Sequence, residues 1–269
     1  MKMSDPASTP LSFRFRYGGL SDIGRRRKRN EDGFLVVDRA GTKDKSELPW
    51  SLCAVADGIG GHTAGDVASS MACDGLKGFF EKLTEKKTGV RSLDALRHSL
   101  VEAFFAIDRR IGRLASTEEA YAHMGTTLSS MLFAGDQAII AHVGDSRIYR
   151  LRENGLNQLT TDHTFVQDLI SYGELTPEQA AVHPFKHMLT AAIGTQEPLE
   201  EVFYDMIALE AEDRFLLCTD GLHDMLEHER IAEILDLGKG PQETVSILVD
   251  AANACGGKDN VTAVAVFLE

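Results

Sequence analysis

Long apolar segments are absent from this sequence. No stretch of the 269 residues approaches the roughly 20 apolar residues that a membrane-spanning helix needs. The first part of the chain, which we interpret as a flexible tail over 1–12, contains no apolar segment of roughly 7 to 15 residues like that of a signal peptide. These absences predict a soluble cytoplasmic protein with no membrane partner.

Cysteine is scarce and scattered. The four cysteines, Cys53, Cys73, Cys218 and Cys255, form no C-x-x-C pair. This spacing favours reduced thiols that are buried as small apolar residues. Reduced thiols are typical of the cytosol.

Basic residues are outnumbered by acidic ones. The chain has 28 lysines and arginines against 41 acids, and the net charge of −13 argues against a nucleic-acid partner. The exception is the uninterrupted basic run from Arg25 to Arg29. In so acidic a chain, such a run either covers a surface or gathers an anion.

No repeat and no Pro/Gly/Ser-rich linker divides the sequence, which predicts a single domain over 13–269. Apolar runs and alternation predict strands over 13–17, 34–37, 52–56, 127–133, 138–143, 146–151, 214–218 and 261–268. The strands 138–143 and 146–151 are expected to form a hairpin through Gly144 and Asp145. Apolar residues at helical spacing predict helices over 64–80, 93–114 and 241–254.

The segment 164–194 breaks this regular pattern. Short helical pieces alternate there with polar loops, and Thr176, Pro177 and Gln179 match a capping box at a helix start. An irregular insertion of this size is typical of a lid or recognition flap. We therefore expect a flap over about 164–194.

Three acids share one sequence context. Asp57, Asp220 and Asp259 each stand at the end or start of an apolar strand, beside a small or polar residue. Each alone is compatible with a turn former or helix cap. Together, carboxylates gathered at one sheet edge would repel each other, and divalent cations between them would turn that cost into affinity. The pattern predicts a two-metal site for hard cations such as Mg²⁺ or Mn²⁺, to which the Gly58 carbonyl adds an oxygen.

Six motifs occur in the order and spacing of the metal-dependent protein serine/threonine phosphatases of type 2C. They are 24–32, 55–62, 124–127, 142–147, 219–221 and 258–262. Over about 13–268 the sequence resembles a bacterial member of this family. The resemblance implies an α+β fold, a four-layer α/β/β/α sandwich of two antiparallel sheets flanked by helices. It also implies a binuclear Mn²⁺ or Mg²⁺ centre at one end.

The resemblance assigns the metal ligands residue by residue. Asp57 would bridge both ions, and the Gly58 carbonyl would bind one of them. Asp220 and Asp259 would hold the other. Asp145, together with Asp220, matches the position where bacterial relatives bind a weaker third metal.

The remaining site residues also follow from the resemblance. Asp32, with Glu31 beside it, would act mainly through metal-bound water. Arg27 matches the residue that grips the substrate phosphate, and His62 matches the proposed general acid. The expected reaction is attack of a metal-bound hydroxide on phosphoserine or phosphothreonine in proteins, reversing a serine/threonine protein kinase.

The sequence departs from the family pattern at two positions. Family members usually have Trp where this chain has His223, and commonly Glu where it has Asp66; neither position is assigned a metal. A phosphatase-like regulatory or phosphopeptide-binding domain with little turnover is the alternative, but it would most simply have lost an acid. A cysteine-based phosphatase is excluded because no cysteine has an arginine six residues further on.

Overall fold

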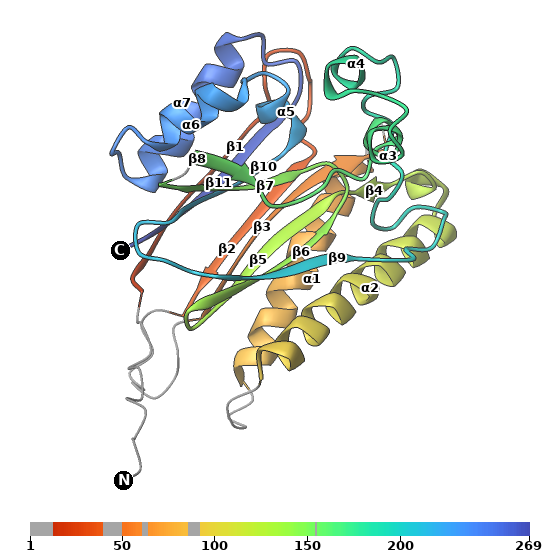
Figure 1. The fold of residues 1–269 in the computed structure, drawn as a ribbon. Coiled ribbons are helices and arrows are strands. Elements are labelled where there is room, and N and C mark those ends of the chain that lie inside the picture. Colours follow the sequence, from red (N-terminus) through yellow and green to blue (C-terminus); the bar gives the residue numbers. More distant parts are fainter. Residues whose placement is uncertain (1–12, 40–49, 61–63, 86–91, 154) are drawn as a thin grey trace.

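Two antiparallel sheets pack face to face, and helices cover the outer face of each (Figure 1). The computed structural model describes residues 13–39, 50–60, 64–85, 92–153 and 155–269. This arrangement confirms the predicted four-layer α/β/β/α sandwich. The predicted tail at 1–12 lies outside the described residues.

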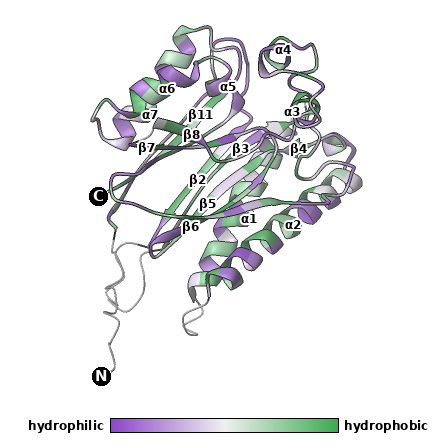
Figure 2. Cartoon of the chain, viewed as in Figure 1, coloured by the Kyte–Doolittle hydropathy of each residue, from purple (hydrophilic) through white to green (hydrophobic). Residues whose placement is uncertain are grey.

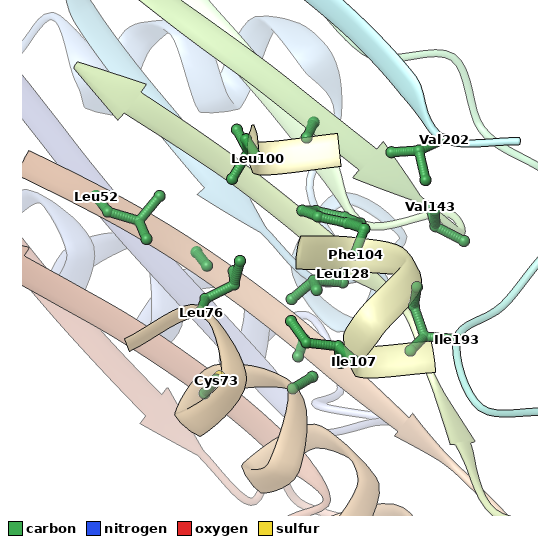
Figure 3. Close-up of a cluster of buried hydrophobic side chains, with 14 of the residues drawn as sticks. Leu52, Cys73, Leu76, Leu100, Phe104, Ile107, Leu128, Val143, Ile193 and Val202 are labelled. Carbon is green, nitrogen blue, oxygen red and sulfur yellow. The ribbon is translucent and has the colours of Figure 1, made fainter. Parts of the chain in front are cut away.

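The larger sheet has six strands. Its order is β2 (Asp32–Asp38), β3 (Trp50–Ile59), β5 (Leu128–Ala134), β6 (Gln137–Val143) and β9 (Phe203–Ala208), with the short β4 (Gly125–Thr126) paired to β3. Its outer face is covered by α1 (Gly65–Glu85) and α2 (Leu93–Thr117). Figure 3 shows the core between them, where Leu76 of α1 and Phe104 of α2 lie beside Leu52 and Leu128.

The smaller sheet has five strands. Its order is β1 (Phe15–Asp22), β11 (Val261–Leu268), β10 (Arg214–Cys218), β7 (Arg147–Arg152) and β8 (Gly155–Gln158). Its outer face is covered by α6 (His228–Leu235) and α7 (Pro241–Ala254), and the one-turn α5 (Asp220–His223) follows β10 directly. Strand β11 is buried along its whole length because both of its faces are covered.

The two sheets meet in a second apolar layer that contains three aromatic rings. The ring of Phe133 in β5 lies with its centroid 5.1 Å from that of Phe15 in β1 and 5.8 Å from that of Phe215 in β10. These contacts connect the six-stranded sheet to the five-stranded sheet. In Figure 2 the hydrophobic colour runs along the central strands, whereas α2 carries hydrophilic residues as well.

Helix starts agree with the sequence signals, whereas α1 runs to Glu85 beyond the predicted end at 80, and α6 was not predicted. The side chain of Ser92 caps α2, and Thr176 and Gln179 form the predicted capping box of α4 (Pro177–Ala181). The segment between β8 and β9 also contains α3 (Phe165–Ser171), and a short 3₁₀ turn (Glu119–Tyr121) follows α2. None of the helices in the described ranges combines the length and apolar character that a membrane crossing demands.

The predicted hairpin over 138–151 is wrong. Strand β6 pairs with β5 and β9, whereas β7 pairs with β10 and β8 in the other sheet. The chain crosses between the sheets at Gly144, which has a φ of +109° and lies so close to Thr127 that a Cβ would be 2.5 Å from its methyl group. A hairpin and a crossing give the same alternation of apolar residues, so the local sequence did not separate them.

One of the four cysteines is exposed, which contradicts the prediction that all of them are buried. Cys53, Cys73 and Cys218 are buried, as expected, but Cys255 is exposed after the end of α7.

The strands β8 and β9 were not predicted at all, because most of their residues are exposed or only partly buried. Both are edge strands, and an edge strand needs less apolar character than a central one.

Candidate metal centre

A cavity of about 1530 Å³ lies where β3 and β10 end and β11 begins. Of the residues named as site candidates from the sequence, it is lined by Arg27, Asp57, Gly58, Asp145, Asp220 and Asp259. The prediction that Asp57, Asp220 and Asp259 lie at the edge of one sheet is wrong. Asp57 comes from the six-stranded sheet, whereas Asp220 and Asp259 flank strands of the five-stranded sheet. The site is therefore shared by the two layers.

Asp57 lies within β3, because the strand continues to Ile59 and does not end before the acid as predicted. Its backbone N–H donates to Thr127 Oγ1 at 2.9 Å, and its carbonyl accepts from the Thr127 N–H and the Thr126 hydroxyl. The next residue, Gly58, packs so closely that a Cβ would lie 2.1 Å from the carbonyl oxygen of Gly65. Glycine is required at this position for steric reasons.

Asp32 is opposite Asp57 in the ladder between β2 and β3. Its Oδ2 accepts a hydrogen bond of 2.8 Å from the hydroxyl of Thr219, which also accepts from the Thr262 N–H. Thr219 therefore ties the two sheets together beside the acids. The residue after it, Asp220, is the first residue of α5.

Asp259 is held by two groups. Its Oδ1 accepts from the N–H of Asn260, and its Oδ2 forms an ion pair of 2.6 Å with Arg27 Nη2. The side chain of Asn260 accepts from the Glu31 N–H and donates to the carbonyls of Ile23 and Arg29. This buried amide, which the sequence analysis missed, fixes both ends of the loop that carries Arg27.

The members of the basic run differ in environment. Arg27 reaches the cavity, whereas Arg29 pairs with Asp66 at 3.1 Å outside the cavity lining. Arg25 and Arg26 are exposed. Only Arg27 of the run is among the cavity-lining residues.

Asp145, which lines the cavity, is in contact with His223. Asp145 is buried, and its carbonyl oxygen lies 3.1 Å from His223 Nε2. Burial lowers the pKa of His223 to about 3. This histidine is therefore neutral at physiological pH and poorly suited to donate a proton. Candidate acid His62 lies outside the described residues, so its role stays a prediction.

The electrostatics of the cavity favour a bound cation. Burial, followed by repulsion from the neighbouring acids, raises the pKa of Asp57 well above its usual value. The same two causes raise the pKa of Asp145 to about 8 and that of Asp220 to about 6. Burial also raises the pKa of Asp32 to about 7, although Thr262 and Thr219 oppose the rise. Carboxyls in this condition gain most from a positive charge among them.

Two carboxylate oxygens without hydrogen-bond partners indicate whether the residues fit metal ions. Asp32 Oδ1 and Asp220 Oδ1 are buried without any hydrogen-bond partner. In the described parts of the chain no three acidic, histidine or cysteine groups already form a complete cage, and Arg27 and Thr219 instead engage Asp259 and Asp32. Unpaired buried carboxylate oxygens are costly unless a cation binds them. The residues therefore fit a divalent metal site, and the carboxylate side chains would have to move closer together to coordinate an ion.

Comparisons with known proteins agree with this geometry. The sequence matches the family Protein phosphatase 2C over residues 25–258. It is 36% identical over 246 residues to the serine/threonine phosphatase stp of Listeria welshimeri, covering 91% of this chain and 93% of that protein. The serine/threonine phosphatase of S. agalactiae has a TM-score of 0.84 at 34% identity, covering 95% of this chain and 100% of that one. The catalytic domain of PstP, solved with two manganese ions, has a TM-score of 0.78 at 35% identity, covering 94% and 98%.

The chain therefore belongs to the protein phosphatase 2C family. It is a protein serine/threonine phosphatase of the type found in bacteria.

Proposed function

We propose that this phosphatase hydrolyses phosphoserine and phosphothreonine in proteins with two Mn²⁺ or Mg²⁺ ions bound in the cavity. The proposal rests on one observation, the convergence of Asp57, Asp220 and Asp259 from two sheets beside Arg27. Carboxylate oxygens suit hard divalent cations. Such ions, when bound, neutralise phosphate oxygens and make water more acidic.

Each acid has a separate proposed part. Asp57, which repels every other acid of the cluster, would bridge the two ions, and the Gly58 carbonyl would bind one of them. Asp220 and Asp259 would hold the other. Asp145, with Asp220, would hold a weaker third ion.

The remaining residues would handle the substrate and the proton. Asp32 would act mainly through metal-bound water, because its Oδ1 accepts no hydrogen bond from the protein. Arg27 would bind the phosphate with the N–H groups that Asp259 does not use. His62 would protonate the leaving serine or threonine oxygen, which is a strong base.

We also propose the setting in which the enzyme acts. Residues 13–269 would form one catalytic unit with the flap at 164–194. Its substrates would be phosphoproteins of the cytoplasm, and its counterpart would be a serine/threonine protein kinase. Nucleic acid and membranes are not expected as partners, since the chain carries a net charge of −13.

Metal removal tests the proposal directly. Protein stripped with EDTA should release no phosphate from a phosphothreonine peptide, and Mn²⁺ or Mg²⁺ should restore turnover. The Asp57→Asn variant should stay inactive at saturating metal, whereas Asp205→Asn, a matched change at an exposed acid of β9, should behave as wild type. Full activity without metal, or equal activity with Zn²⁺ alone, would contradict the two-metal site. Retention of the peptide without phosphate release would favour a binding domain.

A further inference from the structure

The flap segment, residues 164–194, is joined to the rest of the protein by a narrow neck. Thr164 forms a β-bridge with Leu189, and the Thr190 N–H donates to the His163 carbonyl. Beyond this neck, α3 and α4 pack on each other. The neck fixes where the flap begins and ends, but it does not fix where its tip lies.

Apolar burial does not hold the tip either. Four large apolar side chains of the flap face solvent, with exposed fractions of 80% for Tyr172, 83% for Val182, 56% for Phe185 and 45% for Met188. A segment docked by the hydrophobic effect would hide such side chains. The position of the tip must therefore depend on polar contacts.

Those polar contacts converge on the first residue of α5, Asp220, and on its C-cap residue, Asp224. Within the described chain, the hydrogen bonds and ion pairs of residues 166–187 that leave the flap all end on Asp224 or Asp220. Lys186 Nζ lies 3.0 Å from Asp224 Oδ2, and His187 Nε2 lies 3.4 Å from the same oxygen. Both flap residues and Asp224 line the catalytic cavity.

We infer that Asp224 is a positioning residue that holds the flap against the cavity through Lys186, so that the enzyme favours phosphopeptides over small aryl phosphates. The inference rests on the proposed function of the same cavity. Lys186 and His187 line the same cavity as the acids, so we expect a peptide chain to contact them, whereas a small aryl phosphate has no chain that would extend to the flap. A partly exposed ion pair is weak, so it can open and close readily.

Hydrogen exchange measures the Lys186–Asp224 ion pair, which we call the latch, independently of turnover. Lys186→Met and Asp224→Asn should each speed amide exchange within 165–188 about two- to fivefold, the range expected for one such ion pair. The double variant should be no faster than Asp224→Asn, because that single change already removes the charge contacted by Lys186 and by His187. Lys186→Arg should restore slow exchange. Glu174→Gln, which changes an exposed charge elsewhere on the flap, is the matched control.

Steady-state kinetics measure the consequence for substrate choice. In Lys186→Met the KM for a phosphothreonine peptide should rise more than kcat falls. The loss of kcat/KM should be two- to fivefold larger for the peptide than for p-nitrophenyl phosphate. Unchanged flap exchange in both single variants, or equal losses for the two substrates, would overturn the inference. A wild-type protein that turns over no phosphopeptide would overturn the proposed function, while the exchange data still decide whether the latch exists.

Discussion

Replacing Asp220 with asparagine should have opposite effects on stability and on activity. In the metal-free protein the Asp220 carboxyl is buried among other acids, and one of its oxygens has no partner. Asparagine has almost the same shape and no charge. The Asp220→Asn variant should therefore fold more stably without metal, yet lose a proposed metal ligand and nearly all turnover.

The size of the stability gain follows from the pKa of this group. Burial and the neighbouring acids raise the pKa of Asp220 from 3.8 to about 6. Since each pKa unit corresponds to about 1.36 kcal/mol, ionised Asp220 costs on the order of 3 kcal/mol of folding free energy. Because the pKa is raised in the folded state, this cost is complete above about pH 6 and vanishes below about pH 4. The gain from Asp220→Asn should therefore be present at pH 8 and small at pH 4.

Urea unfolding of EDTA-treated protein at pH 8 and pH 4 measures this difference. Calorimetry with Mn²⁺ and a phosphopeptide assay on the same preparations report metal affinity and turnover. Asp205→Asn, at an exposed acid, controls for the general effect of removing a negative charge. Equal destabilisation by Asp220→Asn at both pH values would refute the electrostatic argument. Wild-type Mn²⁺ affinity and rate would refute the assignment of the ligand.

Three further predictions concern the side chains of Arg27, His62 and His142. Arg27→Ala should raise the KM for phosphopeptides about tenfold or more, through loss of charge-assisted hydrogen bonds; a larger loss in Arg25→Ala/Arg26→Ala would identify a different phosphate ligand. His62→Ala should slow phosphopeptide hydrolysis by around 10²–10⁴-fold and p-nitrophenyl phosphate only slightly, because nitrophenolate leaves without a proton; equal losses would make His62 structural. Burial lowers the pKa of His142 to about 3, so this residue by itself should lower the free energy of unfolding by up to about 1.4 kcal/mol per pH unit as pH decreases from 6.5 to 4, a slope opposite in sign to that of the buried acids. His142→Gln should flatten this slope in urea titrations, and an unchanged slope would contradict it.

Most of the fold was predictable because its signals are local. The helix over Pro241–Ala254 and the strand over Val261–Leu268 match the predicted ranges. Pairing was harder, as the crossing at Gly144 demonstrates, because strand partners depend on residues far along the chain. The edge strand Phe203–Ala208 pairs with β6 yet leaves much of its surface in water, so its sequence resembles a loop.

The convergence of three acids was predictable, whereas their arrangement was not. Motif order brought Asp57, Asp220 and Asp259 to one cavity, as expected. The sequence carried no sign that they come from different sheets. It also gave no direct sign of Asn260, whose three hydrogen bonds to the Arg27 loop come from residues roughly 230 positions away. Its place next to Asp259, within the motif 258–262, was the available clue.

The packing between the two sheets bears on the metal centre, because the acids come from both layers. Phe133 of one sheet lies between Phe15 and Phe215 of the other. Asp57 belongs to the six-stranded sheet, and Asp220 follows a strand of the five-stranded sheet, so a change in the volume of this aromatic packing should also change the distance between the two acids. We therefore expect substitutions at Phe133, which does not line the cavity, to alter how well the site accepts a smaller or a larger divalent cation.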